Sequence, residues 1–224
     1  MSAPSTASAA TGRNLAAVAL RAWDLHVTAA HLVPREGPVL LAANHSGFLD
    51  GAVLLAAAPR PTHELAGSAA FVPPWSRLLR SLGQIESGDG VVARSGLVQA
   101  RRVLESGGVV GVFPEPQRGA GDVAHVRHEA AYLALLTGAP VVPVAILGTR
   151  PPGAGADALP RWRSRIDIVF GVPVDIRSSG EPHRRAVVAR SGERLRQVLA
   201  DHVRTACRRT GHDLPGPIPA RSTP

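Results

Sequence analysis

The sequence contains no lysine, and all 25 of its basic side chains are arginines. It has a single cysteine, Cys207, so a scaffold held by intramolecular disulfides is excluded. Aromatic residues make up only 4% of the chain, and no run of about 18 apolar residues is present, which argues against a transmembrane helix. A signal peptide is not predicted either, because residues 1–12 have no basic start. We therefore expect a cytoplasmic protein.

The arginines outnumber the acidic side chains and give a formal net charge of +8. Most of the surplus lies in residues 161–224, where 13 Arg stand against 6 Asp and Glu. A basic region of this kind favours an anionic partner such as phosphate, anionic lipid or nucleic acid. On charge alone, a surface of solvated arginines is the better explanation.

Apolar runs alternate with helical patterns along the chain. Residues 39–43, 109–113 and 141–147 are continuously apolar, as strands buried on both faces of a parallel sheet are. Residues 165–170 alternate and predict a more exposed strand. Helices are predicted at 14–32, 48–58, 76–82, 96–105, 127–136 and 184–208. The pattern predicts an α/β sandwich, with a mostly parallel sheet flanked by helices and an N-terminal helix.

The length suits one domain with a substantial core. We expect a disordered leader at 1–12, a domain at 13–209 and a Pro-rich tail at 210–224. Within that domain, the core covers about 30–175 and a basic C-terminal helix covers 184–208.

His45 and Asp50 follow the first buried strand. Five positions apart on one continuous helix, the two side chains would point in different directions. They can meet if His45 lies in a turn and Asp50 lies in the first turn of the next helix. The carboxylate would then fix the tautomer of the imidazole and leave its other nitrogen as a base. The alternative is a solvated turn histidine followed by a helix-capping aspartate.

No residue near His45 is a convincing protein nucleophile, because Ser46 is its direct neighbour and a Gly-x-Ser-x-Gly elbow is absent. The nucleophile would therefore come from the substrate. Glu115 and Arg118 follow the second buried strand, and the planar guanidinium of arginine is suited to gripping phosphate. A structural salt bridge is the alternative.

Together these segments resemble the glycerolipid acyltransferases, typified by 1-acylglycerol-3-phosphate acyltransferase. The family's first motif, Asn-His-x4-Asp, is matched by Asn44, His45 and Asp50. Its third motif, Phe-Pro-Glu-Gly-Thr-Arg, is matched at residues 113–115 and at Arg118, and its fourth, a Pro-flanked Val-rich strand, at residues 140–143. The order and the separations also agree, and the resemblance covers roughly residues 30–175.

The resemblance implies a fold, an activity and a role for each matched residue. His45 would deprotonate the hydroxyl of a lysophospholipid or glycerol-3-phosphate-like acceptor, and Asp50 would orient His45. Arg118 would bind the acceptor phosphate, and Glu115 would help to shape that site. The acyl group would come from acyl-CoA or acyl carrier protein, with no cofactor. Asn44 and Gln117 complete the set of predicted substrate-binding residues.

The chain departs from the family pattern at several anion-binding positions. Pro116 and Gln117 replace Gly-Thr in the third motif, and proline lacks an amide donor. The second motif reads Gly-Gln-Ile-Glu-Ser-Gly-Asp at 83–89, with acids where the family has an arginine. No lysine precedes it, since residues 66–70 read Ala-Gly-Ser-Ala-Ala, and 128–129 is His-Glu where relatives have a small Gly-containing turn. A catalytically weak homologue that binds lipid or a protein is therefore the alternative function.

Two helices are candidates for contact with a membrane. The arginines of the 184–208 helix could rest on anionic lipid, and the N-terminal helix, with Leu15 and Val18, could dip into the interface. Ordinary packing of both helices on the sheet is the equally favoured alternative. We expect a peripheral protein on the inner face of the membrane. No nucleic-acid partner is predicted, because the basic helix has no aromatic residue for base stacking. No metal is predicted, because the histidines lack metal-ligand spacing.

Overall fold

The computed structural model describes residues 4–71, 73, 75–88, 90–177, 181 and 184–219. The strands are β1 (Asp24–Thr28), β2 (Val39–Ala43), β3 (Thr62–Gly67), β4 (Ile85–Ser87), β5 (Val109–Val112), β6 (Val141–Leu147) and β7 (Arg165–Phe170). The α-helices are α1 (Thr6–Ala19), α2 (Asp50–Ala57), α3 (Trp75–Ser81), α4 (Gly90–Glu105), α5 (Glu129–Thr137) and α6 (Arg185–Thr210). Short 3₁₀ helices cover Leu20–Ala22, Ala30–Leu32 and Ser68–Ala70.

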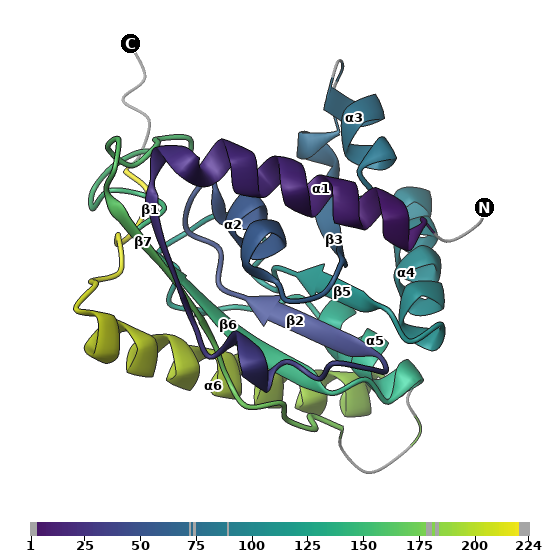
Figure 1. The fold of residues 1–224 in the computed structure, drawn as a ribbon. Helices are drawn as coiled ribbons and strands as arrows, with labels where there is room; N and C mark the ends of the chain where they lie inside the picture. Colours follow the sequence, from purple (N-terminus) through teal and green to yellow (C-terminus); the bar gives the residue numbers. More distant parts are fainter. Residues whose placement is uncertain are drawn as a thin grey trace.

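The strands form one sheet in the order β1-β7-β6-β2-β5-β3-β4. Every neighbouring pair is parallel except β6 and β7, which are antiparallel. Helices α1 and α2 lie along one face, and α5 and α6 lie along the other (Figure 1). This arrangement confirms the predicted α/β sandwich with a mostly parallel sheet. It also places the carboxyl ends of β2, β5, β3 and β4 at the same edge, where open sheets of this kind bind ligands.

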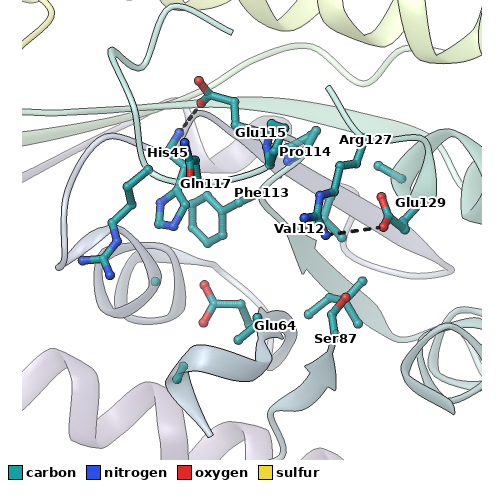
Figure 2. Close-up of a pocket in the computed structure, with 18 of the residues that line it drawn as sticks. His45, Glu64, Ser87, Val112, Phe113, Pro114, Glu115, Gln117, Arg127 and Glu129 are labelled. Carbon is teal, nitrogen blue, oxygen red and sulfur yellow. Dashed lines mark hydrogen bonds and ion pairs between the residues drawn. The ribbon is translucent and has the colours of Figure 1, made fainter. Parts of the chain in front are cut away.

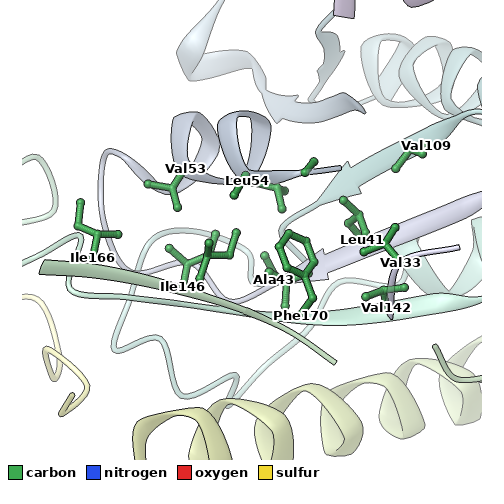
Figure 3. Close-up of a cluster of buried hydrophobic side chains, with 14 of the residues drawn as sticks. Val33, Leu41, Ala43, Val53, Leu54, Val109, Val142, Ile146, Ile166 and Phe170 are labelled. Carbon is green, nitrogen blue, oxygen red and sulfur yellow. The ribbon is translucent and has the colours of Figure 1, made fainter. Parts of the chain in front are cut away.

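Alternate residues of the central strand β2 enter different cores, because successive side chains of a strand point to opposite faces. Leu41 and Ala43 pack with residues of α2, including Leu54 (Figure 3). Leu40 and Ala42 pack with residues of α4 and α5 on the opposite face. All five residues of β2 are buried, so its continuous apolar run reflects burial on both sides.

Strand β7 is more buried than its alternating sequence predicts. Five of its six residues are buried, and the expectation of an exposed strand is wrong. Because β7 lies between β1 and β6, Ile166 and Ile168 join the core beneath α2, while Val169 joins the core beneath α6. The polar residue in the middle of this strand, Asp167, is kept buried by Arg165 and His212, which both contact its carboxylate.

The prediction for the first 32 residues is wrong in two ways. Helix α1 begins at Thr6, so residues 6–12 are helical rather than disordered; residues 1–3 lie outside the described part of the chain. The Ser5 side chain accepts a hydrogen bond from the Ser8 amide at 3.2 Å, and the alanine-rich turn that follows has a high helix propensity. The predicted helix also ends early, because residues 24–28 form β1, which pairs in parallel with β7.

The C-terminal helix α6 agrees closely with its predicted bounds and packs on the sheet through an apolar stripe that includes Leu195, Leu199 and Val203. Several of its arginines point outward, and Arg196 and Arg204 pair with acids one turn away. The packing alternative is therefore confirmed for its apolar face. None of the helices in the described ranges combines the length and the apolarity that crossing a membrane requires.

Gly96 of α4 allows this helix to lie directly against β4. A Cβ at this position would collide with the backbone carbonyl of Glu86, which cannot move without disturbing the strand. We expect Gly96→Ala to lower the free energy of unfolding by about 1–3 kcal/mol, as overpacking does. Gly155→Ala, where a Cβ would meet no atom within 4 Å, is the matched control. Urea denaturation measures the free energy of unfolding of both variants. Equal values for the two variants would contradict the close approach of α4 to β4.

Candidate active site

The loop that follows β2 is anchored to β6 by the side chain of Asn44. Its amide nitrogen donates to the carbonyl of Ile146 at 3.1 Å, and its oxygen accepts from the amide of Ile146 at 2.7 Å. Asn44 is fully buried and is not among the residues that line the pocket described below. The structure thus shows Asn44 fixing the loop, and its predicted contact with substrate stays a prediction.

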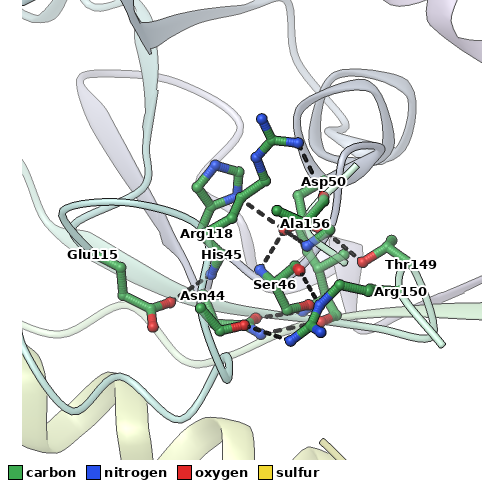
Figure 4. A network of polar contacts seen from close by, with 12 residues as sticks. Asn44, His45, Ser46, Asp50, Glu115, Arg118, Thr149, Arg150 and Ala156 are labelled. Carbon is green, nitrogen blue, oxygen red and sulfur yellow. Dashed lines mark hydrogen bonds and ion pairs between the residues drawn. The ribbon is translucent and has the colours of Figure 1, made fainter. Parts of the chain in front are cut away.

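The carboxylate of Asp50 is fully buried and lies at the centre of this loop (Figure 4). One oxygen accepts from the backbone amides of Ser46 at 2.7 Å and Gly47 at 2.9 Å, and it lies 2.9 Å from Nδ1 of His45. The other oxygen accepts from the hydroxyl of Thr149. His45 lies in the loop and Asp50 is the first residue of α2, so the two side chains meet in the way that the turn hypothesis requires.

This contact fixes how the imidazole of His45 can act. A carboxylate is a hydrogen-bond acceptor, so Nδ1 carries the proton that Asp50 accepts, and Nε2 keeps its lone pair. The ring of Phe113 lies beside the imidazole, with 4.4 Å between the ring centroids. About a quarter of the His45 side chain is exposed, which leaves the ring accessible from the pocket.

A buried arginine that the sequence analysis missed joins several loops around the site. Arg150 donates to the backbone carbonyls of Ser46, Ala154, Gly119 and Gly216, at distances from 2.5 to 2.8 Å. Burial lowers the pKa of its guanidinium, and the negative charge of Asp50 opposes that effect. The one feature of the sequence that points to Arg150 is its position, together with Thr149, shortly after a strand predicted to be buried.

Glu115 contacts His45 through the backbone rather than through the imidazole. Its carboxylate accepts from the His45 amide at 2.5 Å. Burial raises the pKa of Glu115 to about 7, the hydrogen bonds from the amides of His45 and Val123 oppose the rise, and the negative charges of Asp122 and Asp50 add to it. Glu115 therefore supports the loop that carries His45.

The structure shows Arg118 bound to partners other than Glu115. Its guanidinium donates to the carboxylate of Asp157 at 2.8 Å and to the carbonyl of Ala156 at 3.1 Å. The same group lies over the ring of Phe48, with its central carbon 5.6 Å from the centroid. The alternative of a structural salt bridge is therefore confirmed for Arg118 in this conformation, with Asp157 as its partner. Glu115 contacts the backbone amide of His45 instead.

A pocket of about 440 Å³ opens beside His45, at the carboxyl edge of β2, β5, β3 and β4 (Figure 2). Its wall is built from the loop after β5, from β3 and from the start of α5. The lining residues that carry polar or charged side chains are His45, Glu64, Ser87, Glu115, Gln117, Arg118, Arg127 and Glu129. Both lining arginines lie near acids, because Arg118 pairs with Asp157 and Arg127 lies 4.0 Å from Glu129. The pocket thus brings together the predicted residues His45, Glu115, Gln117 and Arg118.

Glu64 on β3 is the second site residue that the sequence analysis missed. It is 6% exposed, and burial, with a contribution from the Asp50 charge, raises the pKa of its carboxyl to about 8. The strand β3 itself was not predicted, because its residues include Thr, His and Glu, which break the apolar pattern. No signal in the sequence distinguishes this glutamate from a surface residue.

The segment of the second motif makes contacts with β3 and with α3. The Gln84 side chain accepts from the amide of Glu64 at 2.8 Å, and Glu86 pairs with Arg80 at 2.5 Å. Asp89 lies outside the described residues. Within the described ranges, no three His, Cys, Asp or Glu side chains are arranged to hold a metal ion.

Comparisons with known proteins agree with this geometry. A family model described as Acyltransferase matches residues 24–147, which is more than half of the chain. The fold is similar to the crystal structure of the 1-acyl-sn-glycerophosphate (LPA) acyltransferase PlsC from Thermotoga maritima, with a TM-score of 0.64 and 20% identity, covering 88% of this chain and 79% of that one. These findings confirm the resemblance that the motifs carry and the predicted fold.

Curated relatives come from Mycobacterium bovis and Mycobacterium tuberculosis, where they are named as uncharacterized proteins. Each is 30% identical over 147 residues, which cover 58% of this chain. The match spans only 39% of the length of these relatives.

The raised pKa of Glu64 makes stability depend on pH with a definite sign. Between pH 4.5 and about 8, the unfolded chain releases this proton and the folded chain keeps it. The contribution of Glu64 to the free energy of unfolding therefore falls as pH rises, by up to about 1.4 kcal/mol per pH unit, and levels off above pH 8. Glu64→Gln removes the titration.

We expect the variant to gain stability relative to the wild type between pH 5 and pH 8, as measured by urea denaturation at each pH. Glu36→Gln, which removes an exposed carboxyl, controls for the change in net charge. A constant difference between Glu64→Gln and the wild type over this range would contradict the neutral buried carboxyl.

Proposed function

Because the chain belongs to the acyltransferase family, we propose that it transfers a fatty acyl group from an acyl thioester to a hydroxyl group of a lysophospholipid or glycerol-3-phosphate-like acceptor. The observation that carries this proposal is the His45–Asp50 pair at the wall of the 440 Å³ pocket. Acyl-CoA or acyl carrier protein would supply the thioester.

The geometry supports a direct transfer with His45 as the general base. Nε2 of His45 removes the proton from the acceptor hydroxyl while its oxygen attacks the thioester carbonyl. The tetrahedral intermediate then collapses and expels the thiolate, which takes the proton back from the imidazolium. The Asp50 carboxylate stabilises the imidazolium and holds the ring in one orientation, because backbone amides and Thr149 fix it in place.

In this proposal Arg118 binds the acceptor phosphate after exchanging its acid partner. The Asp157 side chain is 71% exposed, so its ion pair with Arg118 is partly solvated and weak. A phosphate can accept two hydrogen bonds from the planar guanidinium and so replace the carboxylate of Asp157. Gln117, next to Arg118 in the pocket lining, would contact the same headgroup.

Contact with the inner face of a membrane would bring the acceptor to the pocket. Helix α1 exposes Leu15 and Val18, and the loop beside His45 exposes Phe48, each of them at least half exposed. These side chains are suited to the apolar boundary of a bilayer. A catalytically weak homologue that binds lipid or protein is the alternative, and the pairing of Arg118 with Asp157 favours it, because the cation is already occupied.

His45→Ala should abolish transfer, because it removes the imidazole that Asp50 orients as the base. The measurement is release of free thiol from acyl-CoA by the purified protein, with a panel of lysophospholipids and glycerol-3-phosphate as acceptors. We expect a loss of at least about 100-fold, in line with general base catalysis. His26→Ala removes an exposed histidine and is the control. If the wild type releases no more thiol than His45→Ala with any acceptor, the enzymatic function is wrong and the binding alternative stands.

Arg118→Ala should raise KM for a phosphate-bearing acceptor about tenfold or more and leave KM for the acyl donor nearly unchanged, since a charged hydrogen bond is lost at one substrate only. Arg101→Ala, which removes an exposed arginine paired with Glu105, is the matched control. Steady-state kinetics with both substrates varied separates the two constants. Equal increases in both would refute the phosphate role of Arg118.

A further inference from the structure

The carboxyl of Glu64 lines the pocket, yet none of the steps above uses it. In Figure 2 it lies on the β3 side of the pocket, below Phe113. Its Oε1 atom is buried and has no hydrogen-bond partner among the described residues. A buried polar atom without a partner costs roughly 1–3 kcal/mol, so such atoms are rare and call for an explanation.

The surroundings hold this carboxyl in one place. The Glu64 amide donates to the side chain of Gln84, and the opposite side of the carboxyl faces Gly51 of α2. A Cβ at Gly51 would lie 2.8 and 2.9 Å from the two carboxyl oxygens, so a larger residue there would require the carboxyl to shift. The carboxyl is thus wedged between β3 and α2, against Gly51, which directly follows Asp50 in the chain.

The charges around Glu64 determine which ligand group suits it. Asp50 lies fully buried nearby, and its negative charge disfavours a second anion at this position. Glu64 is consequently a neutral acid at pH 7, which donates one hydrogen bond and accepts another. A hydroxyl group has the same two capacities and is its natural partner. An alkyl chain would leave Oε1 unpaired, and a phosphate would be repelled by Asp50.

We propose that Glu64 binds a hydroxyl group of one of the two substrates inside the pocket and so makes the enzyme prefer a hydroxyl-bearing substrate over its unsubstituted analogue. This inference rests on the proposed acyl transfer for the identity of the substrates. The hydroxyl comes from the acyl chain or from the acceptor headgroup, and the two sources are separated by experiment.

The test measures binding in the His45→Ala background, where no transfer takes place, so its outcome does not depend on turnover. One arm titrates dodecanoyl-CoA and a series of dodecanoyl-CoA thioesters that carry one hydroxyl at different carbons. The other arm titrates lysophosphatidylglycerol and lysophosphatidylpropanol, a phosphodiester whose headgroup has no hydroxyl, with the same acyl chain and below their micelle-forming concentrations. Isothermal calorimetry gives each Kd.

In one arm, we expect the hydroxyl-bearing ligand to bind about tenfold more tightly than its analogue, the effect of one buried hydrogen bond. Adding Glu64→Gln should keep this preference, because the amide still donates and accepts, whereas Glu64→Leu should remove it. Glu129→Leu removes another carboxyl of the same pocket and should leave the ratio unchanged.

Two results would overturn the role of Glu64: no preference in either arm with Glu64 intact, or a preference that survives Glu64→Leu. The first needs no substitution at position 64, so the proposal stays falsifiable even if the leucine variant does not fold. A preference that depends on Glu64 in a protein without thiol release would instead refute the acyl transfer and leave the hydroxyl site standing.

Discussion

The burial of the Asp50 carboxylate is the constraint around which the site is built. An ion removed from water costs several kcal/mol unless hydrogen bonds replace its hydration. Here the replacement comes from the Ser46 and Gly47 amides, the His45 ring and the Thr149 hydroxyl. The loop after β2 and the loop after β6 must therefore close on the carboxylate together. The orientation of the imidazole is a by-product of satisfying this charge.

Arg150 provides the matching cation through its charge, and its guanidinium does not donate to the Asp50 carboxylate. It binds four backbone carbonyls instead, which join the loops around residues 46, 119 and 154 to the segment at 216. Carbonyl oxygens carry partial negative charge, so they compensate the guanidinium while its full charge still acts on Asp50. The site combines one buried anion, one buried cation and a set of loops that neither ion could hold alone.

Local sequence patterns predict the central strands of the fold and the His45–Asp50 pair. They do not predict the buried residues that surround this pair, Glu64 and Arg150. Strands β2 and β6 match their predicted bounds, because burial on both faces leaves an unbroken apolar run. His45 and Asp50 were found because both lie within one short segment. Glu64 and Arg150 were not, because their burial depends on chain segments that only the tertiary fold brings near. Strand β1 was mistaken for helix because its apolar residues continue the spacing of the helix before it.

The bond between Arg150 and the carbonyl of Gly216 also sets an order of events during synthesis. These partners are 66 residues apart, and at 5–20 residues per second the ribosome needs roughly 3–13 s to extend the chain from one to the other. During that interval β2, β5 and β6 are already available to pair, while one carbonyl partner of the guanidinium has not yet been made. The sheet can thus assemble on the ribosome before the loops beside His45 acquire their final support, so the catalytic geometry matures late.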